Sequence, residues 1–361
     1  MTTRRHQMST RIGFRCDGDT QIGLGHIVGC LRLAKLMVQS LGFEAEFQLR
    51  ASPVAENLVR DAGFTVSTVP ASIAPDDDME QLLAASRQRG WAGIVINFCK
   101  ADLERYENHF PVIKTAGLAL IFMDNPIPPG CWQADLLINA LPHPPYPGYE
   151  PSRHPACLDG LEYFLLDETH ERLREQQRQI RPRVERALVA MGGGDADNTT
   201  AKVIEALALA RFSGEVDIVL GAANPHQSAV RALFAACGLK GEVGAGRTDL
   251  ANRIAAADLG FSALGLTTYE MAALGLPVLL IPQLGLNQQV AELYCASLKC
   301  ALLVGSSEIS TPRHIAEVFS LFQNQSVRAT LSTNGTQNVS TSAAKVSEKI
   351  QFLFDKSEYY V

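Results

Sequence analysis

Short runs of apolar and β-branched residues alternate along the chain with longer segments in which apolar residues recur every three or four positions. The first pattern is typical of buried strands and the second of helices that cover a sheet. The clearest helix is expected over residues 26–41, where Ile27, Leu31, Ala34 and Val38 share one face. Strands are expected over residues 12–16, 45–49, 93–96, 118–123, 136–139, 187–191, 216–220, 259–261 and 278–281. Alternation of this kind predicts βαβ units, parallel sheets and an α/β fold.

A proline-rich segment separates the first five expected strands from the last four. Residues 141–158 contain six prolines, which excludes a regular helix or a central strand, and a charged segment follows over 167–186. The chain has 361 residues, more than twice the length of an average domain. We therefore expect two domains, divided as 1–167 (N-terminal), 168–183 (linker), 184–325 (C-terminal) and 326–361 (a polar tail with a helix).

Composition narrows the choice of partners. Hydrophobic residues make up 47% and charged residues 19%, as in a globular protein. The net charge of -6 argues against strong electrostatic binding of nucleic acid by the chain as a whole. No window reaches the 18 apolar residues of a membrane span, and the first eleven residues lack the apolar core of a signal peptide. The eight cysteines form no C-x-x-C pair. We expect a cytoplasmic protein with reduced thiols.

Glycines surround the turn between the first strand and the first helix. Asp17 ends the strand, Gly18, Gly23 and Gly25 lie in the loop, and His26 opens the helix. Glycines allow a ligand to approach the backbone, and a helix N-terminus attracts anions but disfavours an imidazolium. We therefore expect His26 to be neutral near pH 7 and able to accept a proton, with Asp17, Gly23 and Gly25 beside a nucleotide or sugar. A plain glycine turn and a histidine that caps its own helix are the alternatives.

A second glycine loop opens the second half of the chain. Gly192, Gly193 and Gly194 follow a buried strand, and Asp195 and Asn198 precede the next helix. This strand–glycine–helix order again predicts an anion site. The two polar residues either cap the helix or contact a ligand.

A third segment, residues 257–293, places polar side chains after two closely spaced strands. Thr267 and Glu270 have the spacing of a capping box, whereas the functional interpretation of Glu270 is a carboxylate that accepts from a ribose diol. Asn287 and Gln288 lie where the next loop meets a helix. Open α/β sheets bind ligands at this carboxyl end of the strands. We include Thr267 and Thr268 among the expected nucleotide- or sugar-binding residues.

Three consecutive aspartates at residues 76–78 are a candidate metal cluster. They follow a loop that contains proline and precede a helical pattern, so we interpret them as the solvated, acidic start of a helix and expect no metal site. The sequence has no Walker A motif, no G-x-S-x-G elbow and no H-E-x-x-H.

Three motifs together carry a family resemblance: G-x-G-H at the first helix, M-G-G-x-D at the second glycine loop, and Y-E-M-A-A-L-G-L-P followed by N-Q. Over residues 11–301 the chain resembles the UDP-sugar hydrolases of pseudaminic acid biosynthesis and their spore-coat-polysaccharide relatives. More distantly it is similar to the N-acetylglucosaminyltransferase of peptidoglycan synthesis. The resemblance implies a GT-B architecture, in which two Rossmann-like domains face each other across a cleft.

The resemblance also implies roles for single residues. His26 would be the base that activates water, Glu270 would hold the ribose, and Asn287 and Gln288 would approach the sugar and the diphosphate. The glycines 192–194 and Asp195 would line the nucleotide side of the cleft. The nucleotide sugar would be the substrate, and neither a metal nor a redox cofactor is implied.

The chain departs from this family on the sugar-facing side. Asn97, Phe98 and Cys99 replace the family's D-H-Y signature, Gly29 replaces an arginine, and Leu266 replaces a small or hydroxyl residue. The expected function is hydrolysis of a UDP-linked amino or deoxy sugar at its anomeric C–O bond, which releases UDP and free sugar for surface-glycan or nonulosonic acid biosynthesis. The alternatives are a glycosyltransferase that uses an acceptor hydroxyl in place of water, and a nucleotide-sugar binder without turnover.

Overall fold

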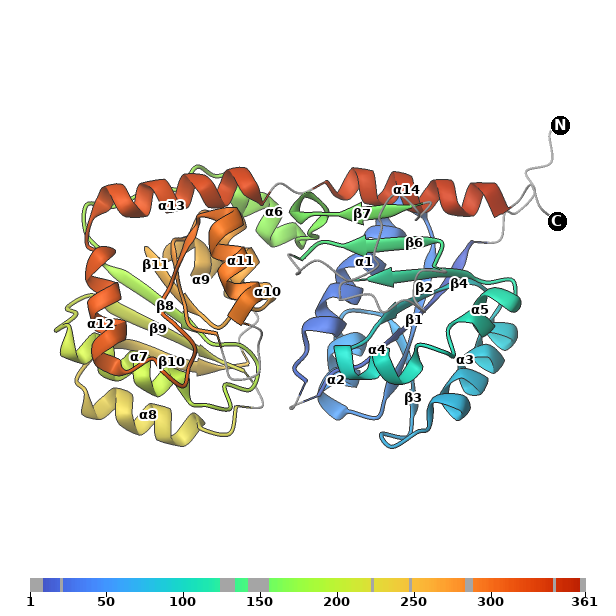
Figure 1. The fold of residues 1–361 in the computed structure, drawn as a ribbon, viewed down its shortest axis with the longest axis horizontal. Helices are drawn as coiled ribbons and strands as arrows, with labels where there is room; N and C mark the ends of the chain where they lie inside the picture. The colour runs from blue at the N-terminus through green and yellow to red at the C-terminus, as the bar shows by residue number, and fades with distance from the viewer. Residues whose placement is uncertain are drawn as a thin grey trace. The chain divides into compact units, whose positions relative to one another are not determined.

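The structure is a computed structural model that describes residues 9–19, 22–123, 134–141, 156–221, 224–246, 249–282, 288–339 and 342–357. The chain forms two compact units. Unit 1 comprises residues 1–165 and 341–361, and unit 2 comprises residues 166–340. Each unit is an α/β structure built on one parallel sheet (Figure 1).

Unit 1 is built on a seven-stranded parallel sheet in the order β3-β2-β1-β4-β5-β6-β7. The chain runs outward from β1 in one direction and then returns to add β4 on the other side of β1. The strands are β1 (Arg11–Cys16), β2 (Glu44–Arg50), β3 (Thr65–Val69), β4 (Trp91–Asn97), β5 (Ala119–Met123), β6 (Leu136–Asn139) and β7 (Cys157–Asp159).

Alternate residues of each inner strand face two separate cores. In β4, Val95 packs on one side of the sheet, whereas Ile94 and Ile96 pack on the other. This explains why the strand is a continuous apolar run, since both faces are covered. On the first side lie α1 (Gly25–Leu41), α2 (Pro53–Asp61) and α14 (Ala343–Ser357), and on the second lie α3 (Pro75–Arg89), α4 (Lys100–Tyr106) and α5 (Pro111–Thr115) (Figure 1).

The expected helix over 26–41 is confirmed as α1. Its apolar face is buried against β1, β2 and β4. The helix ends at Leu41 because Gly42 adopts a left-handed conformation with φ of 68°, and the N–H of Gly42 bonds the carbonyl of Val38.

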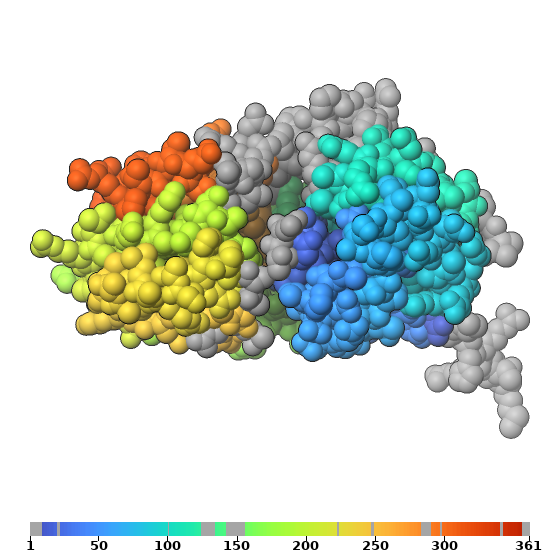
Figure 2. Space-filling view, turned by 90° about the horizontal axis from the view of Figure 1, so that it is seen from below, coloured from blue at the N-terminus to red at the C-terminus, as the bar shows by residue number. Residues whose placement is uncertain are grey.

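Unit 2 is built on a six-stranded parallel sheet in the order β10-β9-β8-β11-β12-β13. Its strands are β8 (Arg186–Ala190), β9 (Glu215–Leu220), β10 (Lys240–Ala245), β11 (Leu259–Ser262), β12 (Val278–Leu280) and β13 (Ala301–Leu303). Its helices are α6 (Glu168–Arg174), α7 (Thr199–Leu209), α8 (Gln227–Ala236), α9 (Leu250–Ala256), α10 (Leu266–Ala273), α11 (Gln288–Leu298), α12 (Pro312–Leu321) and α13 (Gln325–Asn338). Helix α7 packs between α12 and α8 on the outer surface (Figure 2).

The unit boundaries differ from the expected domain boundaries at both ends of unit 2. The segment expected to be a linker belongs to unit 2, because all three guanidinium nitrogens of Arg178 donate to backbone carbonyls of that unit. The tail is divided. Helix α13 packs on α10 of unit 2, whereas α14 buries Val346 and Ile350 in the core of unit 1.

The nine expected strands are all confirmed. Four further strands, β3, β7, β10 and β13, are the outermost strands of the two sheets. Within the part of the chain that the structure describes, no helix is long and apolar enough to cross a membrane.

Candidate active site

His26 lies at the point where the strand order of unit 1 reverses. The loop after β1 leads into α1, and His26 is the second residue of that helix. The neighbouring strand β4 ends at Asn97, which pairs in register with Cys16. The strands β1 and β4 are parallel, but the chain continues from β1 to α1 on one face of the sheet and from β4 to α4 on the other. The two loops therefore diverge, and this is where open parallel sheets bind ligands.

Asn97 orients the imidazole of His26. Nδ1 of His26 lies 2.8 Å from Oδ1 of Asn97. An accepting amide oxygen places the ring hydrogen on Nδ1, which leaves a lone pair on Nε2. Burial lowers the pKa of His26 below its usual value, although the bond from Asn97 and the charges of Asp17 and Asp102 oppose the shift. The half-buried ring is therefore neutral near pH 7, with the tautomer that a general base requires.

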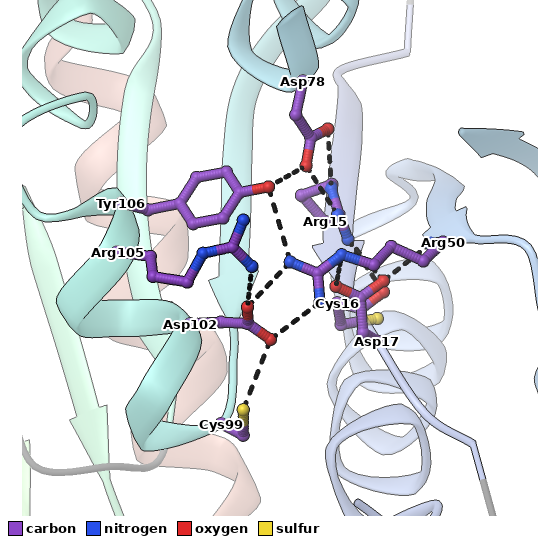
Figure 3. A network of polar contacts seen from close by, with 9 residues as sticks. All are labelled: Arg15, Cys16, Asp17, Arg50, Asp78, Cys99, Asp102, Arg105 and Tyr106. Atoms are coloured by element: carbon purple, nitrogen blue, oxygen red, sulfur yellow. Dashed lines mark hydrogen bonds and ion pairs between the residues drawn. The ribbon is translucent and has the colours of Figure 1, made fainter. Parts of the chain in front are cut away.

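A buried network of arginines and carboxylates lies at the carboxyl ends of β1 and β2 (Figure 3). We call Arg15, Asp17, Arg50, Asp78 and Asp102 the arginine–carboxylate network. Arg15 is fully buried and bonds Asp17 through Nη1 at 2.7 Å and Asp78 through Nη2 at 2.7 Å. Arg50 makes a bidentate pair with Asp102 at 2.7 and 2.9 Å. Buried charges of this kind are tolerated because each has an opposite partner.

Asp17, expected beside a nucleotide or sugar, is a member of this network. Its Oδ1 accepts from Nη1 of Arg15 and from the backbone N–H of Arg50, both at 2.7 Å. The carboxylate thus joins the ends of β1 and β2 and contributes a negative charge near His26. A direct ligand contact from Asp17 stays a prediction.

The three residues that replace D-H-Y have three separate partners. Asn97 bonds His26. The ring of Phe98 is buried under the guanidinium of Arg15, with 4.8 Å between its centroid and Cζ. Cys99 donates from Sγ to Oδ2 of Asp102 at 3.3 Å, and burial raises the pKa of this thiol. Phe98 and Cys99 thus contact members of the network, whereas Asn97 contacts His26.

Asp78 corrects the expectation for the three aspartates. The helix start is confirmed, because residues 76–78 form the first turn of α3. However, Asp78 is fully buried, where it binds Arg15 and accepts from the hydroxyl of Tyr106 at 2.7 Å. Only Asp76 and Asp77 are solvated. Among the described residues, no group of three or more His, Cys, Asp or Glu side chains is placed to hold a metal ion.

The loop before His26 is shaped by a small turn. The N–H of Gly23 donates to the carbonyl of Asp19 at 3.1 Å, and Gly23 has φ of 79°. Gly25 is the first residue of α1, whose N-cap is Leu24. The alternative that His26 caps its own helix is wrong, since His26 lies inside the first turn.

In unit 2 the strand order reverses between β8 and β11, and a glycine-containing segment follows each of these two strands. The 192–194 loop leaves β8, and Gly265 precedes α10 after β11. Gly192 has φ of 87°, and the backbone of Gly193 lies so close to Gly221 that a Cβ on Gly221 would be 2.0 Å from the carbonyl oxygen of Gly193. The expected anion loop is thus pressed against the end of β9.

Asp195 caps α7. Its two carboxylate oxygens accept from the backbone N–H groups of Thr199 at 2.8 Å and Thr200 at 3.1 Å. Burial raises the pKa of Asp195, against these bonds. The capping alternative is confirmed for Asp195. Asn198 occupies the N-cap position, but its side chain makes no capping bond.

The capping-box interpretation of Thr267 and Glu270 is wrong. The helix begins at Leu266, two residues before the start that a Thr267 cap would require, so Gly265 is the N-cap and Thr268 is the third helical residue. The hydroxyl of Thr268 is buried, accepts from the N–H of Gly265 at 3.2 Å and lies 2.8 Å from Oγ of Ser262. It therefore shapes the loop. Thr267 is half-buried in the first turn of α10.

Glu270 is buried within unit 2, with Oε2 3.8 Å from Nε2 of His170. Asn287 lies outside the described residues, and Gln288 is described only by its backbone, as the first residue of α11. The ligand contacts predicted for Glu270, Asn287 and Gln288 stay predictions.

Sequence reasoning missed Arg15, Arg50 and Asp102. One signal was present, because Arg15 interrupts the apolar run of β1, and a charged residue inside a buried strand requires a partner. Arg15 finds its distant partner, Asp78, on α3, and the second pair joins Arg50 of β2 to Asp102 of α4. No local sequence pattern connects these elements.

No protein-family profile matches the chain. An uncharacterized protein of Methanocaldococcus jannaschii is 22% identical over 293 residues, which covers 79% of this chain. The aligned part spans 58% of the length of that relative.

Solved structures are similar over nearly the whole chain. MurG of Acinetobacter baumannii covers 95% of this chain and 99% of its own, with a TM-score of 0.67 and 16% identity. UGT2 of Phytolacca americana, in complex with UDP-2-fluoro-glucose and pterostilbene, covers 97% and 100%, with a TM-score of 0.66 and 11% identity. The calicheamicin glycosyltransferase CalG4 covers 96% and 98%, with a TM-score of 0.61 and 15% identity. The chain has the GT-B fold.

Proposed function

We propose that this chain is a nucleotide-sugar-dependent enzyme that transfers a glycosyl group from UDP to an oxygen nucleophile, with His26 as the general base. The observation that carries the proposal is the 2.8 Å contact between Nδ1 of His26 and Oδ1 of Asn97 at the strand-order reversal of unit 1. It directs Nε2 away from Asn97, and burial keeps the ring neutral.

In this proposal, unit 2 binds the nucleotide. Its own strand-order reversal is flanked by the 192–194 loop and by the N-terminus of α10, two places where backbone N–H groups suit a diphosphate. Glu270 on α10 is the carboxylate proposed to accept from the ribose diol. The UDP-sugar derivative bound to UGT2 of Phytolacca americana supports this class of ligand.

The proposed reaction needs one proton acceptor. Nε2 of His26 removes the proton from the nucleophile's hydroxyl as its oxygen attacks the anomeric carbon. The bond from that carbon to the UDP oxygen breaks, and its electron pair leaves on UDP. Asn97 cannot stabilise the resulting imidazolium with a charge, but the carboxylates of Asp17 and Asp102 are close enough to raise the pKa of His26. We propose no redox cofactor, because nothing is oxidised or reduced.

Transfer to an acceptor hydroxyl is the first candidate and hydrolysis the second. The similarity to CalG4, which is a glycosyltransferase, favours an acceptor. The three sequence motifs around His26, Gly192 and Glu270 favour water, through their resemblance to UDP-sugar hydrolases. The same base and the same leaving group serve both reactions.

A panel of UDP-sugars, incubated with and without hydroxyl acceptors, tests the proposal by the rate of UDP release. Release that depends on an acceptor supports transfer, and release in water alone supports hydrolysis. Tight binding of UDP-sugars without release would support the binder instead. A protein that neither binds UDP nor releases it would overturn the proposal.

A further inference from the structure

A buried histidine in unit 2 lies between two carboxylates and plays no part in the reaction proposed above. His170 is only 4% exposed. Its Nδ1 lies 2.8 Å from Oδ1 of Asp167, and its Nε2 lies 3.8 Å from Oε2 of Glu270. The line Asp167–His170–Glu270 therefore connects the start of α6 to the middle of α10.

The position of His170 is fixed from its own helix. Asp167 is the N-cap of α6, and its Oδ1 accepts from the backbone N–H of His170 at 3.0 Å. The same oxygen faces Nδ1 of the ring. One carboxylate thus caps the helix and also lies 2.8 Å from Nδ1, which limits how far the imidazole can turn.

The segment that carries His170 is also fastened to the far end of α10. Nε of Arg178 donates to the carbonyl of Leu274, the residue that follows α10, at 2.8 Å. Nη2 of Arg178 donates to the carbonyl of Ile254 at 2.7 Å. The segment from His170 to Arg178 thus contacts α10 near its middle and just after its end, while α6 itself packs on α9.

The imidazole of His170 faces the carboxylate of Glu270. At 3.8 Å the contact is longer than a hydrogen bond and within ion-pair distance, and Glu270 is only 4% exposed. A buried carboxylate is costly unless opposite charge or hydrogen-bond donors face it. His170 presents a ring nitrogen, Nε2, to this carboxylate. Its orientation by Asp167 therefore limits where the carboxylate of Glu270 can point.

We propose that His170 is a positioning residue for nucleotide binding, which holds Glu270 in the orientation that accepts from the ribose diol. The inference rests on the proposed function, because it requires the ribose role of Glu270. In this proposal, the segment from Asp167 to Arg178 determines how strongly unit 2 distinguishes a ribonucleotide from a deoxyribonucleotide.

The test compares the affinities of the full chain for UDP and for 2′-deoxy-UDP, measured by calorimetry. The native protein is expected to prefer UDP by about tenfold, the effect of one lost hydrogen bond to a charged group. His170→Phe keeps the ring's bulk without its nitrogens, and should bring the ratio to within about twofold of one. His170→Gln restores a donor near the position of Nε2 and should recover most of the preference. In a steady-state assay, His170→Phe should raise KM for the UDP-sugar and leave kcat within about twofold.

The matched control is His314→Phe. His314 also lies in unit 2 and bonds a backbone carbonyl, that of Val304, at 2.8 Å, so its loss should leave the UDP preference unchanged. If His170→Phe does not fold, Asp167→Asn replaces it, since asparagine is an equally good helix cap but carries no charge toward Nδ1. Asp167→Asn should reduce the preference by about threefold.

Two failures are distinguishable. If Glu270→Gln abolishes the preference while His170→Phe and Asp167→Asn retain it, the positioning role is overturned and the proposed function stands. If the native protein does not bind UDP, or Glu270→Gln leaves the preference intact, the ribose role itself is wrong.

Discussion

Asn97 and His26 meet across the carboxyl ends of β1 and β4, with 2.8 Å between Oδ1 of the amide and Nδ1 of the ring. The amide fixes which ring nitrogen carries the hydrogen without adding a charge. A carboxylate in the same position would also stabilise the imidazolium that forms during proton transfer. The hydrolases that the sequence motifs resemble have an aspartate in this position. In the proposed reaction, Asn97 would therefore keep the orientation of the base but supply no charge to stabilise the imidazolium.

Replacement of His26 should remove most turnover. His26→Gln cannot accept the proton, so UDP release from the preferred UDP-sugar is expected to fall by about 10² to 10⁴. Within the described part of the chain, the half-buried ring makes one side-chain bond, to Asn97, so the thermal midpoint should change little. His109→Gln, in the same unit and also half-buried, is the control and should retain activity. Equal activity of His26→Gln and native protein would eliminate His26 as the base.

Asn97→Asp should move the acid limb of the pH–rate profile to higher pH. The base works only when neutral, so activity is lost as pH falls through the pKa of His26, which burial holds below its usual value of about 6.5. A carboxylate at Nδ1 favours the imidazolium and should raise this pKa by one unit or more. The measurement is kcat/KM for the UDP-sugar from pH 4.5 to 8.5.

Asn97→Ala is the control for that experiment. It removes the orienting amide without adding charge, so activity should fall with no upward shift of the acid limb. An unshifted limb in Asn97→Asp would mean that the limb reports another group.

Asp78→Ala should destabilise unit 1 by about 3 kcal/mol, because it removes one of the two carboxylates that pair with the fully buried Arg15. It also leaves the hydroxyl of Tyr106 without its acceptor in Asp78. Asp77→Ala changes the adjacent, exposed residue of the same helical turn and should stay within about 0.5 kcal/mol of the native protein. Urea unfolding measures both. Equal midpoints would contradict the network's structural role.

Substitutions at two glycines distinguish the effect of the shape of the 192–194 loop from the effect of its proposed contact with the nucleotide. A Cβ on Gly221 would lie 2.0 Å from the carbonyl oxygen of Gly193, so Gly221→Ala should displace the loop and lower both the melting temperature and the affinity for UDP. Among the described residues, and apart from its own chain neighbours, no heavy atom lies within 4 Å of a Cβ on Gly193. Gly193→Ala should therefore keep the melting temperature and weaken UDP binding by about tenfold, as expected where backbone approaches a phosphate closely. Unchanged UDP affinity in both variants would place the nucleotide elsewhere.

The sequence by itself determined the class of fold. The nine inner strands are recognisable because both faces of each are covered, which demands apolar residues at successive positions such as Ile94, Val95 and Ile96. The edge strands β3, β7, β10 and β13 each have one neighbouring strand and include residues that are not buried, so none is covered on both faces along its whole length. The helix that begins beside His26 follows equally from its own apolar spacing.

Only the tertiary structure decided which distant residues meet. The order of strands brings Asn97 to His26 and Asp78 to Arg15, and the packing of α6 brings His170 to Glu270. The tertiary structure also places α14 in unit 1 and residues 166–183 in unit 2. Pairings of this kind depend on how sheets and helices assemble across long stretches of chain, whereas periodicity reports only on neighbours a few residues apart.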